Sequence, residues 1–261
     1  MSPPSCPEGL QIELDLTFLD TMFDVRLALA LGVVLVGGIV LGFAGFGTGL
    51  IFVALLSLIY NPREAVSLLV IMGTLGAAML FPPATRHAIW REALPVAGTA
   101  ILVLPLGSYV LLTLDQHTMQ RAIGVVVLVL SFLAFRGITY LGPRGFGVHI
   151  LAGLISGIVA GATALGRMLV ALYFISAKHP PVVQRANIIV VGSTISLCNL
   201  IVLTLTGVIT IELAARGAVL FLPFAATIWL GTRFFRATTA EWFRRIVSGL
   251  IMVISVATII F

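Results

Sequence analysis

Arg167 stands in an apolar stretch of the chain, where no nearby loop explains its charge. Residues 162–165 before it and 168–174 after it are almost entirely apolar. A guanidinium in such a stretch is expensive unless it is paired or hydrated, and its planar fork of donors matches a pair of oxyanion oxygens. We expect Arg167, with Gly166 before it, to contact an anionic substrate. Two other roles stay open, namely a side chain that reaches the membrane interface or one bonded to carbonyl groups of the opposite half of the chain.

A glycine-rich segment from Gly42 to Gly49 is the second candidate site. Its central residues are Gly45, Gly47, Thr48 and Gly49. Glycine lets the backbone leave helical geometry, which is tolerated at membrane depth only where protein or water satisfies the freed amides. A half-helix after such a break directs its partially positive N-terminus into the break, and this favours an anion. The alternative is that these glycines serve close packing of helices.

Small polar side chains within the apolar stretches are further candidates for lining a substrate path. They are Thr74, Ser193, Thr194 and Asn199. Hydroxyl groups in membrane helices more often bond a carbonyl one turn back, so each of them also has a purely structural explanation. The amide of Asn199 must find partners either across a helix interface or in a cavity.

The residue types that are missing narrow the function further. All ten carboxylates lie in the leading tail, in loops or at the ends of apolar stretches, which argues against proton relays, sodium cages and cationic substrates. The four histidines are scattered, and no HExxH or Gly-x-Ser-x-Gly pattern occurs, so we expect no enzyme activity. Cys6 and Cys198 match no metal spacing, and we predict neither a metal site nor a cofactor.

Composition places these residues in a membrane. Of the 261 residues, 60% are hydrophobic and 10% are charged, against roughly 25% charged in a soluble domain. The apolar stretches have the length of membrane spans, so we expect an all-α polytopic membrane protein in contact with the lipid bilayer. The net charge of +5 comes from residues between the spans, where they set orientation, and nucleic-acid binding is not expected.

The apolar stretches predict about eight transmembrane helices, or up to ten elements if the broken segments count separately. They span residues 25–43, 50–60, 65–81, 94–114, 119–135, 148–165, 168–177, 182–205, 213–230 and 246–261. Each half of the chain contains one unusually short stretch, which follows a glycine-rich break.

Two halves of the chain share their glycine and proline spacing. A shift of 119 residues superposes six such positions and also places Ser193 on Thr74. The glycine and proline pairs are Gly38/Gly157, Gly42/Gly161, Gly47/Gly166, Pro62/Pro181, Gly73/Gly192 and Gly98/Gly217. With a five-residue insertion, this pattern predicts two homologous repeats, residues 25–136 and 147–261, joined through broken helices. The same glycine faces could serve a homodimer as well as the internal fold.

Loop charges predict the orientation. Residues 1–24 form an acidic tail without lysine or arginine, which differs from a signal peptide. A basic excess lies in loops opposite the termini, so those loops are expected in the cytoplasm and both termini in the periplasm. These basic residues are Lys178, Arg185, Arg233, Arg236, Arg244 and Arg245.

The duplicated unit resembles the TauE/SafE family of sulfite exporters, a family of bacterial membrane transporters. The segment from Gly42 to Gly49 is similar to the family's glycine-rich signature, and residues 169–173, 184–187, Asn199 and Gly207 are similar to its second signature. The chain departs from the family pattern at Thr48, where many members have a third glycine, and at Arg167, where many have proline.

The resemblance implies a secondary transporter of a small sulfur-containing anion such as sulfite, thiosulfate or an organosulfonate. It would act in the bacterial inner membrane by alternating access, with the two glycine breaks meeting near the midplane. Arginine in place of proline is expected to retune the site for a more highly charged anion. An anion channel and a non-transporting membrane scaffold or assembly subunit are the alternatives that the residues leave open.

Overall fold

The structure is a computed structural model that describes residues 25–46, 48–49, 52, 56, 62–135, 142 and 145–237. The described residues form eight α-helices. These are α2 (Val25–Ala44), α4 (Pro62–Thr85), α5 (Trp90–Thr113), α6 (Gln116–Phe135), α7 (Phe146–Thr163), α8 (Gly166–Ile175), α9 (Pro181–Leu205) and α10 (Ile211–Ala237). The acidic tail, Gly47, most of the stretch 50–60 and the final stretch 246–261 lie outside the described residues.

The helices confirm that the chain is an all-helical, multi-pass membrane protein. Five of them are long and apolar enough to span a bilayer, namely α4, α5, α7, α9 and α10, and α2, α6 and α8 contain shorter apolar segments. The predicted stretches agree with these helices to within a few residues at most ends. The clearest difference is α10, which continues to Ala237 although its apolar stretch ends at residue 230. Hydropathy ends the stretch early because Arg233 and Arg236 are charged, but both residues are still helical.

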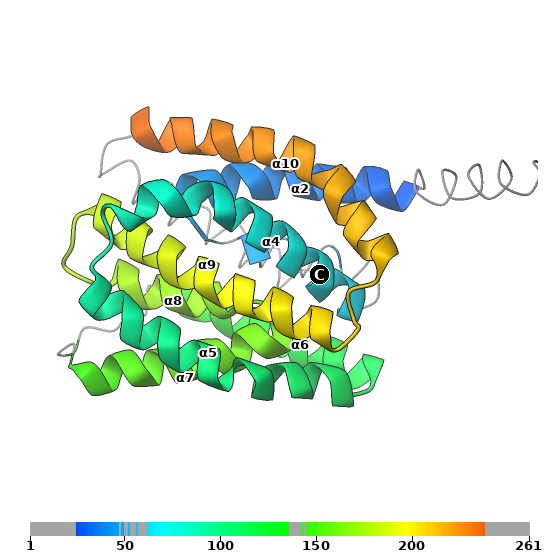
Figure 1. The fold of residues 1–261 in the computed structure, drawn as a ribbon, viewed down its shortest axis with the longest axis horizontal. Coiled ribbons are helices and arrows are strands. Elements are labelled where there is room, and N and C mark those ends of the chain that lie inside the picture. The colour runs from blue at the N-terminus through cyan, green and yellow to red at the C-terminus, as the bar shows by residue number, and fades with distance from the viewer. Residues whose placement is uncertain are drawn as a thin grey trace, which may run out of the picture.

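The helices pack in three layers (Figure 1). Helices α2 and α10 form one flank, α5 and α7 form the other, and α4 and α9 cross between the flanks. Helix α8 packs against α7 and α9. Each flanking pair therefore joins the first helix of one half of the chain to a helix of the other half.

Glycines set the close approach within both flanks. A methyl group at Gly42 would lie 2.2 Å from the Ile228 carbonyl oxygen, and one at Gly161 would lie 2.2 Å from the Leu104 carbonyl oxygen. Backbones at this distance leave no room for a side chain, so small residues are required at these positions. The packing explanation offered for Gly42 is therefore confirmed, while it does not extend to every glycine, since Gly124 has no neighbour within 4 Å.

Both breaks have the same backbone geometry. Helix α2 ends at Gly45, which has a φ of 81°, and its N–H donates to the Leu41 carbonyl at 2.8 Å. Helix α7 ends at Ala164, which has a φ of 58°, and its N–H donates to the Ala160 carbonyl at 2.8 Å. This left-handed conformation suits glycine and costs an alanine about 1 kcal/mol or more. Both helices are therefore followed by a residue in the same left-handed conformation, although only the first break has glycine at that position.

Helices α4 and α9 run in opposite directions. Thr74 in α4 donates from Oγ1 to the Ser196 carbonyl at 3.0 Å, while Asn187, nearer the start of α9, accepts from the Ile89 N–H beyond the end of α4 at 2.7 Å. In contrast, α2 and α10 run in the same direction, as do α5 and α7 (Figure 1). Helices α4 and α9, whose Gly73 and Gly192 the shift of 119 residues superposes, thus point in opposite directions.

Candidate functional site

Both breaks meet at one buried cavity of about 40 Å³ between α4 and α9. The cavity walls come from six segments of the chain. The lining residues are Leu41, Thr48, Gly49, Leu69, Val70, Gly73, Ala160, Ala164, Leu165, Arg167, Met168, Ile195, Ser196 and Asn199. A water molecule needs about 10–15 Å³ of such space, so the cavity has room for a few waters or one small ion. The cavity thus joins residues that are more than a hundred positions apart in the sequence.

Arg167 is the charged residue of this cavity. Its Nη2 donates to the Gly192 carbonyl at 3.1 Å and to Ser196 Oγ at 2.9 Å. No carboxylate in the described part of the chain forms an ion pair with it. The guanidinium is therefore oriented by two neutral acceptors of α9, and its positive charge is not neutralised by a described side chain. Both of these described partners, Gly192 and Ser196, belong to its own half of the chain, so the described contacts give no bond to a carbonyl of the opposite half.

The first break is held by a second arginine, which sequence reasoning treated mainly as a cytoplasmic anchor. Arg185 donates from Nη2 to the Gly42 carbonyl at 2.6 Å and from Nε to the Phe43 carbonyl at 3.1 Å. Its guanidinium carbon lies 4.3 Å from the centre of the Phe235 ring. The last carbonyls of a helix lack partners within that helix, and a cation there is favourable. Arg185 therefore caps α2 at the break.

Of the ten predicted site residues, four line the cavity: Thr48, Gly49, Arg167 and Asn199. Gly47 lies outside the described residues. Asn199 is 1% exposed and donates from Nδ2 to the Ala160 carbonyl at 2.9 Å. Thr48 donates from Oγ1 to the Gly37 carbonyl across a long 3.4 Å contact. The cavity therefore collects polar groups from both breaks and from α9.

The other five predicted residues are not among the lining residues. Gly45 forms the turn of the first break, and Gly166 packs against α7, where a methyl group would lie 2.2 Å from the Ser156 carbonyl oxygen. Thr74 bonds the Val70 and Ser196 carbonyls, and Thr194 bonds the Val190 carbonyl one turn back. Ser193 is buried, and its Oγ has no hydrogen-bond partner among the described residues.

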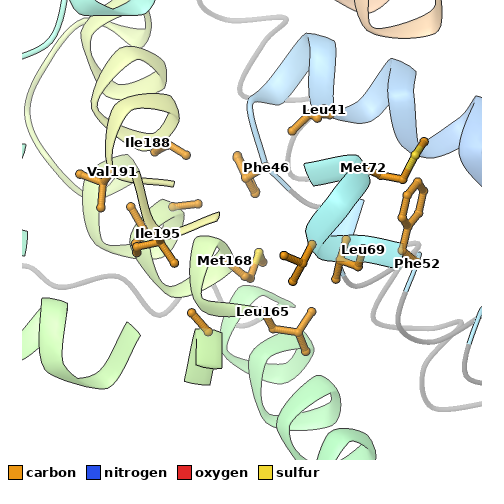
Figure 2. Close-up of a cluster of buried hydrophobic side chains, with 14 of the residues drawn as sticks. Leu41, Phe46, Phe52, Leu69, Met72, Leu165, Met168, Ile188, Val191 and Ile195 are labelled. Carbon is orange, nitrogen blue, oxygen red and sulfur yellow. The ribbon is translucent and has the colours of Figure 1, made fainter. Parts of the chain in front are cut away.

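Sequence reasoning did not select Ser196 or the apolar part of the cavity wall. Ser196 lies on the same face of α9 as Asn199, three residues away, and this spacing was the available signal. Figure 2 shows the surrounding apolar side chains, with Phe46 of the first break between Ile188 of α9 and Met72 of α4. Met168 and Leu165 of the second break approach them, and both are buried. These groups exclude water and strengthen electrostatic interactions in the cavity.

A larger cavity of about 420 Å³ opens between the ends of α4, α9 and α10. Three of its lining residues are basic or can become so, namely His87, Arg185 and Arg236. Arg185 lines this larger cavity and bonds the first break at the Gly42 carbonyl, whereas Leu41 and Thr48 line the smaller cavity. We call these two spaces the outer cavity and the central cavity.

Two further polar contacts connect α8 and the loop after it to α7 and α5. His179 Nε2 lies 3.0 Å from Glu92 Oε1, which links the loop after α8 to α5. The hydroxyl oxygen of Tyr173, near the end of α8, lies 2.8 Å from His149 Nδ1 in α7. Among the described residues, no three histidine, cysteine, aspartate or glutamate side chains gather as metal ligands.

The described residues form an all-helical bundle with long apolar helices, which is typical of a multi-pass membrane protein, and its broken helices bring Arg167 to the central cavity. The sequence model of the family described as Sulfite exporter TauE/SafE matches residues 29–258, and the chain belongs to this family. The resemblance inferred from the two glycine-rich segments is thereby confirmed, and the family consists of transporters, not enzymes. No curated protein and no solved structure matches the chain.

Replacement of Gly192 by alanine tests the position of Arg167 without removing its charge. A methyl group there would lie 2.6 Å from Arg167 Nε and 2.9 Å from its Cγ, so the flexible side chain must move. We expect Gly192→Ala to lower kcat/KM for anion uptake about tenfold, equivalent to the loss of one hydrogen bond to a charged group. Gly124→Ala, where nothing lies within 4 Å, is the control. Wild-type uptake by Gly192→Ala would show that the arginine position is unimportant.

Replacement of Arg185 tests the cap of the first break. Arg185→Gln removes a charged donor from two carbonyls at the end of α2, which we expect to destabilise the fold by about 2–3 kcal/mol. At this chain length that loss corresponds to a Tm lower by roughly 5–10 °C. Thermal unfolding in detergent measures it, with the exposed neighbour Arg236→Gln as control. Equal Tm values for the two variants would show that capping of α2 by Arg185 does not stabilise the fold.

Proposed function

We propose that the protein is a secondary transporter that carries a small sulfur-containing anion, such as sulfite, thiosulfate or an organosulfonate, across the bacterial inner membrane. The observation that carries the proposal is the central cavity, where Arg167 faces both breaks without an ion-paired carboxylate among the described residues. A buried cation that lacks a protein counter-ion favours a site whose counter-ion is the substrate.

The geometry of the second break supports an anion in this cavity. Helix α8 begins at Gly166, and Leu165, Arg167 and Met168 of its first turn line the cavity. The first amides of a helix have no partners within it and carry partial positive charge. On the opposite wall, Thr48 and Gly49 are helical residues that follow the first break. Arg167 together with the start of α8 resembles the half-helix N-termini that bind anionic substrates in transporters.

Two inverted repeats, residues 25–136 and 147–261, would provide the moving parts. The matching contacts of the flanks support this division: Gly42 meets Ile228 as Gly161 meets Leu104, which is the same pair after the shift of 119 residues and the five-residue insertion. The opposite directions of α4 and α9 favour inverted repeats over parallel ones. Alternating access then follows from rocking of one repeat against the other around the central cavity.

Charge distribution supports the orientation. The described residues at the end that holds the outer cavity include six basic residues and one acidic residue: Arg86, Arg91, Lys178, Arg185, Arg233, Arg236 and Glu92. The opposite end has four basic and three acidic residues: Arg26, Arg63, Arg121, Arg216, Glu64, Asp115 and Glu212. The more basic end would face the cytoplasm, which puts the outer cavity there and the tail 1–24 in the periplasm.

Uptake into proteoliposomes tests the proposed function. Purified protein is reconstituted, and uptake of radiolabelled sulfite, thiosulfate and methanesulfonate is measured against protein-free vesicles. Saturation and accelerated exchange against internal substrate identify a carrier, whereas flux that rises linearly with concentration without exchange identifies a channel. Absence of protein-dependent uptake for all three anions would contradict the proposal.

A further inference from the structure

The orientation of the Asn199 amide in the central cavity is determined by its neighbour. Its nitrogen donates to the Ala160 carbonyl at 2.9 Å, and a carbonyl oxygen accepts hydrogen bonds but cannot donate them. Exchange of the amide nitrogen and oxygen would place two oxygens in contact, so the assignment is fixed by chemistry. Asn199 Oδ1 therefore faces away from Ala160. It is buried and has no hydrogen-bond partner among the described residues.

Three other polar side chains line the cavity, and two of them have hydrogens to donate. Arg167 uses Nη2 for its two described hydrogen bonds, which leaves the hydrogens of Nη1 and Nε available. Ser196 Oγ accepts from Arg167, so its own hydroxyl hydrogen is free to donate. Thr48 gives its hydroxyl hydrogen to the Gly37 carbonyl, so its Oγ1 offers lone pairs only. The described side chains thus combine one positive charge and several donors with Asn199 Oδ1, a buried acceptor without a described partner. Buried acceptors in native proteins almost always have a partner, and one without a partner calls for an explanation.

From this arrangement we infer that the central cavity binds a monoanionic oxyanion that still carries one acidic hydroxyl group. The hydroxyl donates to Asn199 Oδ1, and the charged oxygens accept from Arg167 and Ser196. A fully deprotonated dianion would direct only lone pairs at Asn199 and would bring two negative charges to one arginine. The inference rests on the proposed function and adds the protonation state of the substrate to it. It differs from the sequence-based expectation that arginine in place of proline retunes the site for a more highly charged anion.

The inference explains how transport can depend on a pH gradient without a carboxylate among the described residues that line the central cavity. The proton travels on the substrate. Each monoanion that crosses the membrane carries one proton with it, whereas a dianion would carry none. No group of the protein has to titrate during the cycle. Asn199 is then a specificity-determining residue, because its acceptor distinguishes a hydroxyl from an oxyanion oxygen.

The experiment compares two monoanions of similar size in proteoliposomes that contain the full chain. Hydrogen sulfite can carry its proton on an oxygen, whereas the methyl group of methanesulfonate is bonded to sulfur and none of its three oxygens carries a proton. At a pH where much of the sulfite is protonated, we expect wild-type kcat/KM to be at least tenfold higher for hydrogen sulfite. Asn199→Leu should reduce this preference to within about twofold, while Thr204→Val, at an exposed site on the same helix, should preserve it.

A pH series on the wild-type protein keeps the inference testable if Asn199→Leu does not fold. At constant total sulfite, the initial rate above protein-free vesicles should follow the hydrogen sulfite concentration, and methanesulfonate uptake should stay flat. Equal kcat/KM for the two anions, or a sulfite rate that rises with the dianion, would overturn the inference and leave the proposed carrier intact. Absence of uptake for every anion would overturn both.

Discussion

Arg167→Ala is expected to reduce saturable anion uptake at least about 100-fold in kcat/KM. Among the described residues that line the central cavity, Arg167 is the one with a charged side chain, and hydrogen bonds to charged groups contribute about 1.5–3 kcal/mol each. Two such contacts to a bound anion account for a loss of this size. The fold should persist, because the partners left behind are a helix carbonyl of Gly192 and the hydroxyl of Ser196. Uptake by proteoliposomes measures the loss.

Two matched variants make this result specific. Arg167→Lys keeps the charge but loses the planar fork, so we expect intermediate uptake. Arg121→Ala removes an exposed arginine from α6 and should transport at the wild-type rate. Full uptake by Arg167→Ala, with normal yield and Tm, would contradict the substrate role of Arg167 and would favour the non-transporting scaffold considered from the sequence.

Gly161→Ala is expected to have the largest effect on stability. The added methyl group would lie 2.2 Å from the Leu104 carbonyl oxygen and 2.6 Å from the Ser108 amide nitrogen. Both neighbours are backbone atoms, so α5 and α7 must separate, which costs about 3 kcal/mol or more. We expect a Tm in detergent lower by roughly 6–12 °C and a smaller monodisperse fraction on gel filtration.

The corresponding position in the other flank provides an independent check. Gly42→Ala would place its methyl group 2.2 Å from the Ile228 carbonyl oxygen, so its effect should be of similar size. Gly124→Ala, in open space on α6, should be neutral or slightly stabilising because alanine favours helix over glycine. A Gly161→Ala protein as stable as Gly124→Ala would show that the flanks are not closely packed in the membrane.

Local properties of the chain were enough to predict the helices and the breaks. Spans follow from hydropathy, and the breaks at Gly45 and Ala164 follow from the small residues around them, because backbone that leaves a helix in a membrane needs such residues. Arg167 was identifiable for the same reason, since a charge inside an apolar stretch stands out whatever its neighbours are. Thr48, Gly49 and Asn199 were selected from their types and positions alone.

Long-range contacts could not be predicted in this way. Thr74 and Thr194 resemble Ser196 in the sequence, yet the structure turns the first two toward helix carbonyls and places only Ser196 in the cavity wall. The role of Arg185 depends on carbonyls that lie 142 and 143 positions away. The rotation of each helix about its own axis determines which hydroxyl group lines the cavity, and hydropathy does not report this rotation.

The sequence by itself determined that this chain is a helical membrane protein of the TauE/SafE family with two glycine-rich breaks, one of which contains an arginine. Those properties are local, since they depend on the transfer of single segments into the bilayer and on backbone freedom at single residues. Only the tertiary structure decided that both breaks share one cavity, that each flank joins the two halves, and that Asn199 Oδ1 is buried without a described partner. These features depend on the packing of helices from opposite halves, which approach closely at Gly42 and Gly161.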